Sequence, residues 1–293
     1  MKLGIAGIGK MGAAIAARLI EVGHVVTVWN RTPEKARSVA GAKMAANPAE
    51  LAENSDVIIT ILTDAPALNA VYSGPSGLLH GKVAGRLFLD MSTVLPTTEI
   101  ALAGAVRAKG AAFVECPVGG STGPARQGKL IGLMGAEPAD AARARPILEQ
   151  LCRRLEHAGP VGSGSVLKFT INLPLMVYWQ ALGEALAMAR TVAIEPERLM
   201  DLLSDTSGAA NVLKVRAPGI ASMLKGGSAG AVTFDVDSAI KDMQSMVAEA
   251  KSRGIELPLV ERTLGCYQET RQHRSGNAEI STVSVYWASR DHH

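Results

Sequence analysis

Short apolar, β-branched runs alternate along the first half of the chain with longer stretches in which apolar residues recur every three or four positions. Such alternation predicts parallel strands joined by crossover helices. Met11, Ile15, Leu19 and Val22 have the spacing of one helix face that packs on a sheet. The candidate strands are Lys2–Ala6, His24–Trp29, Val57–Leu62, Arg86–Asp90, Ala112–Glu115 and Leu130–Met134.

The second half of the chain has a helical pattern, and strand-like runs stop at about residue 160. One helix is especially clear, because Asp235 or Asp237 can cap its start and Gly254 followed by Pro258 can end it. Its apolar stripe consists of Val236, Ile240, Met243, Val247 and Ala250. We therefore expect a doubly wound α/β domain of Rossmann type over residues 1–160 and an all-helical domain over 161–293, joined by a long continuous helix.

A glycine motif, Gly7-Ile8-Gly9-Lys10-Met11-Gly12, lies between the first predicted strand and the first predicted helix. In that context Gly7 permits a tight turn, Gly9 lets the backbone approach a pyrophosphate, and Gly12 allows close helix packing. The N-terminus of the helix adds N–H donors and a positive dipole. The motif predicts a dinucleotide site that includes Ile8, Lys10 and Met11, in preference to a glycine turn without a ligand.

The end of the second predicted strand indicates which dinucleotide is bound. An acidic residue there would bind the ribose 2′-hydroxyl of NAD, but this chain has Asn30-Arg31-Thr32. Arg31 can pair with a 2′-phosphate, and Asn30 and Thr32 can hydrogen-bond to it. NADP is therefore the predicted cofactor; the alternative is a solvated Arg31 and a site that accepts either dinucleotide. Leu62 and Thr63, at the end of the third strand, are also counted among the cofactor-binding residues.

Two further polar segments follow predicted strands, and the carboxyl ends of parallel strands are where open α/β sheets bind ligands. One is Asp90-Met91-Ser92-Thr93, and the other runs from Glu115 through Gly119-Gly120-Ser121. Glycine-rich backbone with nearby hydroxyl groups suits a small carboxylate. Each segment alone is no more than a turn, but together with the dinucleotide motif they predict one ligand-binding region.

Lys168 and Asn172 begin the helical half and are four residues apart, so they share one face of a helix. A lysine in an apolar stretch can move a proton on or off a substrate oxygen while the asparagine orients the same group. For that role, the usual lysine pKa of about 10.4 has to be lowered by desolvation or by a nearby positive charge. The alternative is a surface lysine whose stem covers apolar neighbours.

Composition narrows the class of protein. The 293 residues are 47% hydrophobic, 19% charged and only 4% aromatic, with a net charge of +3, which argues against nucleic acid as a partner. Cys116, Cys152 and Cys266 form no close pair, and His292 and His293 are too few for a metal site, so we expect no disulfide framework and no metal. Without a membrane span or signal sequence in the pattern, a cytoplasmic protein is expected.

The order of these motifs resembles the β-hydroxyacid dehydrogenase family, whose members include 3-hydroxyisobutyrate dehydrogenases and glyoxylate/succinic semialdehyde reductases. The resemblance covers nearly the whole chain. Its matching elements are Gly7 to Gly12, Asp90-x-Ser92-Thr93, Pro117-Val118-Gly119-Gly120 running to Gly128-x-Leu130, Gly164-x-x-x-Lys168-x-x-x-Asn172, and Phe234 through Lys241-Asp242. The Asn30-Arg31-Thr32 triplet is more similar to the NADP-preferring semialdehyde-reductase branch than to the NAD-preferring hydroxyisobutyrate branch.

The resemblance implies a nucleotide-binding domain, a helical domain that also builds the interface of a homodimer or homotetramer, and a cleft between them. It makes Lys168 the general acid/base and Asn172 a substrate-holding residue. It also implies that Ser92 and the segment Gly119 to Ser121 bind the substrate carboxylate, and that Thr93 and Lys241 approach the nicotinamide and its ribose. The expected activity is NADP(H)-dependent hydride transfer with a small β-hydroxyacid, semialdehyde or 2-oxoacid.

Two departures from the family pattern affect the substrate. The usual Ser-Gly-Gly is Gly119-Gly120-Ser121 here, which displaces the hydroxyl, and Pro174 predicts a kink just beyond Asn172. An NADPH-dependent imine reductase on the same scaffold is the nearest alternative, although Lys168 argues against it. A non-catalytic dinucleotide-binding scaffold is a further alternative, and the presence of both Lys168 and Asn172 argues against that one.

Overall fold

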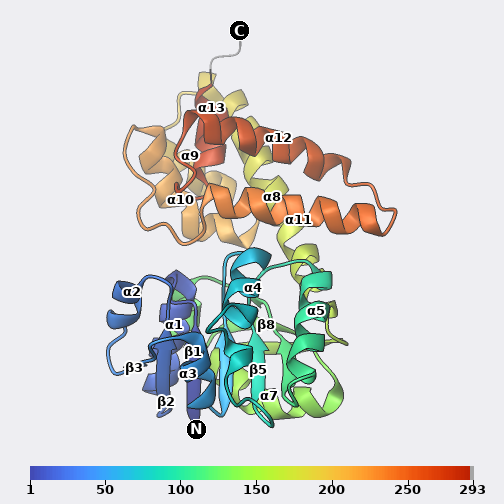
Figure 1. Cartoon of the computed structure of the whole chain (residues 1–293). Helices are drawn as coiled ribbons and strands as arrows, with labels where there is room; N and C mark the ends of the chain where they lie inside the picture. Colours follow the sequence, from blue (N-terminus) through green and yellow to red (C-terminus); the bar gives the residue numbers. More distant parts are fainter. Residues whose placement is uncertain (291–293) are drawn as a thin grey trace. The chain divides into compact units, whose positions relative to one another are not determined.

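The computed structural model describes residues 1–290, so His292 and His293 lie outside the described residues. The chain divides into two compact units, Met1–Lys168 and Phe169–His293. Helix α8 (Ser163–Met188) is continuous across the boundary between them. Figure 1 shows the sheet of the first unit and the helices of the second.

The first unit is built on a nine-stranded sheet in the order β3-β2-β1-β4-β5-β6-β8-β7, with β9 paired to β8. Strands β1 to β6 run parallel, β8 is antiparallel to β6 and β7, and β9 is parallel to β8. The order reverses at β1, which pairs with β2 on one side and β4 on the other. The strands are β1 Lys2–Ala6, β2 Val25–Trp29, β3 Lys43–Met44, β4 Val57–Thr60, β5 Leu87–Asp90, β6 Ala112–Glu115, β7 Val118–Gly119, β8 Leu130–Gly135 and β9 Cys152–Gly159.

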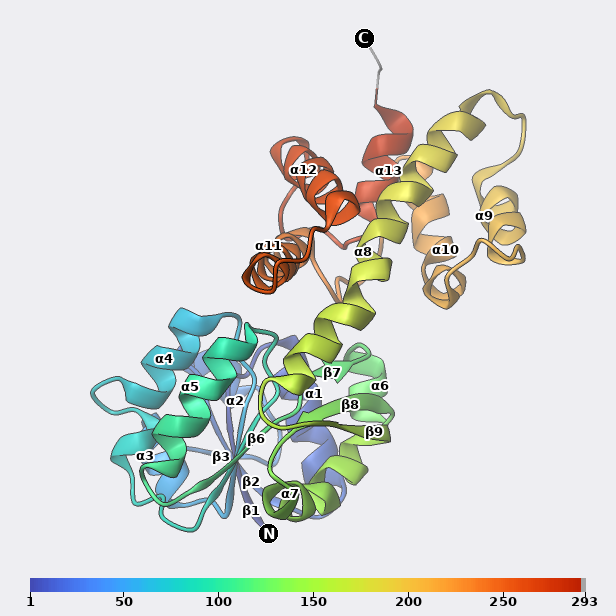
Figure 2. The ribbon, with the colours of Figure 1, turned by 90° about the vertical axis from the view of Figure 1, so that its right-hand side faces the viewer.

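Helices cover both faces of this sheet, with α3, α4 and α5 on one side and α1 and α7 on the other (Figure 2). Ile58 and Phe88 point into the first layer, whereas Ile5 and Leu89 point into the second. This doubly wound arrangement confirms the predicted fold class. The helices of the unit are α1 Lys10–Glu21, α2 Pro33–Arg37, α3 Pro48–Glu53, α4 Ala65–Ser73, the short 3₁₀ helix Leu78–His80, α5 Pro96–Arg107, α6 Thr122–Arg126 and α7 Pro138–Leu151.

All six predicted strands form, and their ends agree with the sequence pattern to within two residues. Strands β3, β7 and β9 were not predicted. The sequence of β9, Cys152–Gly159, is mostly charged or polar and its side chains are largely accessible, as is typical of an edge strand. Because one of its sides has no neighbouring strand in the sheet, such a strand needs no continuous apolar run.

The second unit is helical, as predicted. Helix α11 starts where Asp235, and not Asp237, accepts a 2.9 Å hydrogen bond from the Ser238 backbone N–H. It ends before Gly254, whose φ is +68°, and α12 begins at Pro258. The helices after α8 are the 3₁₀ helix Ala189–Thr191, α9 Pro196–Ser204, α10 Asn211–Leu224, α11 Val236–Ser252, α12 Pro258–His273 and α13 Thr282–Ser289.

Helix α8 continues through Pro174 instead of ending there, and the predicted kink stays a prediction. One turn beyond it, Trp179 is 1% exposed, and its carbonyl accepts a hydrogen bond from the Ser284 hydroxyl of α13. Trp179 therefore belongs to the core of the helical unit. Within residues 1–290, no helix combines the length and the apolar character needed to cross a bilayer.

Candidate functional site

The turn between β1 and α1 has the shape that a pyrophosphate requires. Gly7 has a φ of +103°, and a Cβ atom on Gly12 would lie 2.0 Å from the Gly7 carbonyl oxygen. A Cβ atom on Gly9, by contrast, would meet no protein atom within 4 Å. Gly9 is also the N-cap of α1, where no side chain caps the helix and no acidic residue stands in the first turn. The residues present therefore fit an anionic cofactor at this helix N-terminus.

Asn30 has a structural role that the sequence did not predict. Its Oδ1 atom accepts a 2.9 Å hydrogen bond from the Ile8 N–H, and its Nδ2 atom donates to the Thr32 carbonyl at 3.0 Å. Asn30 thus ties the end of β2 to the glycine turn. Arg31 and Thr32 next to it are exposed, and Thr32 makes no side-chain cap to α2. These two side chains, more than Asn30, are the ones available to a ligand at this strand end.

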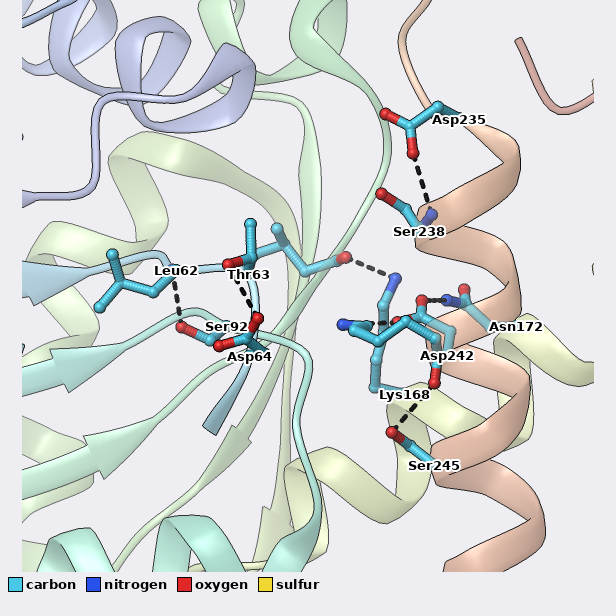
Figure 3. A network of polar contacts seen from close by, with 12 residues as sticks. Leu62, Thr63, Asp64, Ser92, Lys168, Asn172, Asp235, Ser238, Asp242 and Ser245 are labelled. Carbon is cyan, nitrogen blue, oxygen red and sulfur yellow. Dashed lines mark hydrogen bonds and ion pairs between the residues drawn. The ribbon is translucent and has the colours of Figure 1, made fainter. Parts of the chain in front are cut away.

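The ends of β4 and β5 are held together by polar contacts of Ser92 (Figure 3). The Leu62 N–H donates to the Ser92 hydroxyl at 2.9 Å, and the Ser92 N–H donates to Asp90 at 2.8 Å. Thr60 donates to the other oxygen of Asp90. Ser92 is only 1% exposed, so in this structure it supports the strand ends, while the flanking Thr63 is exposed and Thr93 is half-buried.

The glycine-rich segment after β6 forms β7 and the start of α6. Gly119 pairs with Ile131 of β8, and Gly120 has a φ of +119°, a conformation that favours glycine. Ser121 is the N-cap of α6 but makes no side-chain cap bond. The reordered triplet therefore places a backbone conformation that favours glycine at its second residue and the hydroxyl side chain at its third.

Lys168 lies beside this segment within the first unit. Its Nζ atom donates a 2.8 Å hydrogen bond to the Val118 carbonyl oxygen, and the residue is only 9% exposed (Figure 3). A buried ammonium group needs hydrogen-bond acceptors, and one of them is this backbone carbonyl. The contact directs the amine to the residue that precedes Gly119. The sequence alternative of a solvated surface lysine does not describe this side chain.

In the second unit, Asp242 joins the other two predicted site residues. Its Oδ1 atom lies 2.8 Å from Lys241 Nζ, and its Oδ2 atom accepts from Asn172 Nδ2 at 3.4 Å (Figure 3). Asp242 is 3% exposed, so its charge is compensated by these neighbours instead of by water. Asp242 belongs to a motif of the sequence that predicted no role for it; an acid among the apolar positions of an amphipathic helix was the available signal.

Three carboxyl groups are buried in the first unit near the ends of β5 and β6. Burial raises the pKa of Asp90. Burial raises the pKa of Glu99 strongly, and the like charges of Asp90 and Glu115 raise it further. Burial also raises the pKa of Glu115 to about 7, against the lowering effect of hydrogen bonds from Ser165, Gly164 and Gly162. Within residues 1–290, no group of three or more His, Cys, Asp or Glu side chains is arranged to hold a metal ion.

Comparison with known proteins gives two matches that together span most of the chain. A family model described as the NAD binding domain of 6-phosphogluconate dehydrogenase matches residues 2–159. A second, described as NAD-binding of NADP-dependent 3-hydroxyisobutyrate dehydrogenase, matches residues 162–286.

Individual relatives agree with these matches. The 3-hydroxyisobutyrate dehydrogenase of Pseudomonas aeruginosa is 33% identical over 258 residues, which cover 86% of this chain and 86% of that protein. Glyoxylate/succinic semialdehyde reductase 1 of Arabidopsis thaliana is 30% identical, with 97% of both chains covered. A solved 3-hydroxyisobutyrate dehydrogenase from Salmonella typhimurium has the same fold, with a TM-score of 0.86, 22% identity, and coverage of 97% of this chain and 99% of that one.

The doubly wound sheet, the open glycine turn and the helical second unit define an oxidoreductase with an NAD(P)-binding domain. More specifically, the chain belongs to the β-hydroxyacid dehydrogenase family.

Proposed function

We propose that this protein is an NADP(H)-dependent oxidoreductase that transfers a hydride between nicotinamide and a small β-hydroxyacid, semialdehyde or 2-oxoacid. The observation that carries the proposal is the buried Lys168 amine, hydrogen-bonded at 2.8 Å to the carbonyl of Val118, beside the glycine-rich segment. Family membership indicates the reaction type. The contact with Val118 holds the amine of Lys168, the proposed proton-transfer group, beside the glycine-rich segment.

Cofactor binding is assigned to the first unit, together with Lys241 of the second unit. Backbone N–H groups from Gly7 to Gly12 hold the pyrophosphate, with Ile8, Lys10 and Met11 among the contacting residues. Arg31 and Thr32 bind the 2′-phosphate of NADP, while Asn30 fixes the turn through Ile8. Leu62, Thr63, Thr93 and Lys241 complete the cofactor-binding set. When bound, the cofactor supplies or accepts the hydride.

The substrate carboxylate is assigned to the backbone of Gly119 and Gly120 and to the hydroxyl of Ser121. Ser92 supports this binding by holding the end of β5, and Asn172 orients the reacting oxygen with its own amide fixed by Asp242. In reduction, Lys168 Nζ would donate a proton to the substrate oxygen that takes up the C=O π pair. In oxidation, Lys168 removes the same proton.

The preference for NADP and for the reductive direction both follow from the Asn30-Arg31-Thr32 triplet. We also assign residues 1–160 mainly to NADP binding and to contacts with the substrate carboxylate. Residues 161–293 are assigned to substrate binding through Asn172 and to assembly into a homodimer or homotetramer. Light scattering of the purified protein measures the number of chains in the assembly.

The deciding experiment follows the loss of reduced-nicotinamide absorbance with NADPH or NADH. The substrates are glyoxylate, succinic semialdehyde, methylmalonate semialdehyde and a cyclic imine. We expect turnover of a carboxylated aldehyde with NADPH, abolished in Lys168→Ala. Turnover of the imine alone would identify an imine reductase instead. Cofactor binding without turnover of any substrate would identify a dinucleotide-binding scaffold.

A further inference from the structure

Glu115, the last residue of β6, reaches across to the start of α8. Its Oε1 atom accepts hydrogen bonds from the backbone N–H groups of Gly162 at 2.6 Å and Gly164 at 2.7 Å. Its Oε2 atom accepts from the Ser165 hydroxyl at 2.8 Å. The side chain is fully buried, although about fifty residues of sequence separate it from its partners. One carboxylate therefore satisfies donors at the N-terminus of the helix that carries Lys168.

Two glycines leave the space that this carboxylate occupies. Gly135 of β8 is the register partner of Glu115, and a Cβ atom there would lie 2.2 Å from Glu115 Oε1. A Cβ atom on Gly164 would lie 3.1 Å from the same oxygen and 2.3 Å from the Leu133 carbonyl oxygen. The site for the carboxylate is thus formed by β8 and α8 together, and a carboxylate at a helix N-terminus is favoured by the helix dipole.

The end of β6 also lies close in sequence to Val118, which accepts the hydrogen bond of Lys168. Three residues after Glu115 the chain reaches Val118, whose carbonyl receives the Lys168 Nζ hydrogen bond. Glu115 and Val118 therefore hold α8 at two levels, the first at its N-terminal turn and the second at the lysine amine. We infer that Glu115 is a positioning residue for Lys168. The ionised carboxylate of Glu115 fixes α8, so that the lysine amine keeps its place beside the glycine-rich segment.

This inference rests on the proposed role of Lys168, and it adds a pH dependence. Burial raises the pKa of Glu115 to about 7. The titratable groups that face it are Asp90, its register partner on β5, with Glu99 of α5 and the adjacent Cys116 thiol. Protonation of Glu115 weakens its charge-assisted hydrogen bonds to the first turn of α8. Activity is then expected to fall as the pH drops through the neutral range.

The test compares Glu115→Gln with wild type and with Glu156→Gln, an acid on β9 whose side chain is 47% exposed and pairs with Arg154. Glutamine keeps an acceptor for Gly162 and Gly164 but has no charge. We expect kcat at pH 8 to fall about tenfold in Glu115→Gln, and the inflection of kcat near pH 7 to disappear. KM for the cofactor should stay as in wild type, and Glu156→Gln should behave as wild type throughout. An unchanged kcat and an unchanged pH profile in Glu115→Gln would overturn the inference.

A second measurement does not depend on turnover. Amide hydrogen exchange of Gly162 and Gly164 in the full chain is compared between wild type and Glu115→Gln at each pH. We expect protection in wild type to exceed that of the variant at pH 8, and the two to converge at pH 6. If wild type shows no Lys168-dependent turnover but this difference persists, the proposed function fails and the anchoring of α8 by Glu115 stands. Equal protection at both pH values would overturn the anchoring itself.

Discussion

The Nζ atom of Lys168 lies 2.8 Å from the carbonyl oxygen of Val118, which joins the first turns of α8 to the strand that begins the glycine-rich segment. Because the lysine is almost completely buried, its position is set by protein groups and not by water. We expect Lys168→Ala and Lys168→Met to lower kcat about 10²- to 10⁴-fold, since general acid/base groups contribute on that scale.

Lys251 provides the matched control, because its side chain is 70% exposed on α11. Lys251→Ala should keep wild-type kcat and KM. Steady-state kinetics and a fluorescence titration with NADPH measure turnover and cofactor binding separately. Retention of more than half of the wild-type kcat in Lys168→Met would show that the proton is transferred by another group.

Replacing Gly9 or Gly12 by alanine is expected to change different properties, cofactor affinity alone for Gly9 and also stability for Gly12. A methyl group on Gly9 meets no protein atom within 4 Å, so Gly9→Ala should fold with wild-type stability and lose cofactor affinity about tenfold or more. A methyl group on Gly12 meets the Gly7 carbonyl oxygen at 2.0 Å, so Gly12→Ala should also lower the melting temperature. Thermal unfolding and NADPH titration of both variants give the comparison, and undiminished NADPH affinity in Gly9→Ala would contradict the assigned pyrophosphate position.

Cofactor preference is expected to depend on Arg31 more than on Asn30. Arg31→Ala should raise KM for NADPH about tenfold and leave KM for NADH unchanged, because only NADPH carries the 2′-phosphate. Asn30→Ala removes the acceptor of the Ile8 N–H and should weaken both cofactors alike. The ratio of kcat/KM for the two cofactors measures the effect, and an unchanged ratio in Arg31→Ala would place the 2′-phosphate elsewhere.

The raised pKa of Glu115 predicts a pH dependence of stability. The folded protein keeps this proton up to about pH 7, whereas the unfolded chain releases it near the ordinary value of 4.5. The folded state therefore binds more protons between these values, and stability is lost as the pH rises through that window. The cost of the buried charge above pH 7 is up to about 3 kcal/mol. Glu115→Gln should thus be more stable relative to wild type at pH 8 than at pH 5.

Urea unfolding at several pH values measures this difference. Glu115→Gln also removes the like charge that Glu115 exerts on Glu99, which acts in the same direction. Glu156→Gln, whose wild-type side chain is partly exposed on β9, should follow wild type at every pH. A constant free-energy difference between wild type and Glu115→Gln from pH 5 to pH 8 would contradict the assignment of this titration to Glu115.

Local sequence determined the six predicted strands, the glycine turn and the capped helix α11, because each depends on residues close together in the chain. The short apolar run after Lys2, for example, is typical of a strand such as Lys2–Ala6 that is buried on both faces. A Gly7-x-Gly9-x-x-Gly12 spacing likewise describes its own turn. The same kind of local motif predicted part of the candidate site, because Lys168 and Gly119 each lie in a recognisable segment of the sequence.

The tertiary structure decided how those segments support one another. The hydrogen bonds that Glu115 accepts from α8, Asn30 from Ile8 and Asp242 from Asn172 each join residues that are more than twenty positions apart. No periodicity records such pairs, because a buried polar side chain finds its partner only when the strands and helices pack. For the same reason Ser92, which the motif assigned to the substrate, lies buried between two strand ends. The sequence by itself determined the fold class and singled out Lys168 as a candidate, and packing decided which polar groups contact this lysine and its helix.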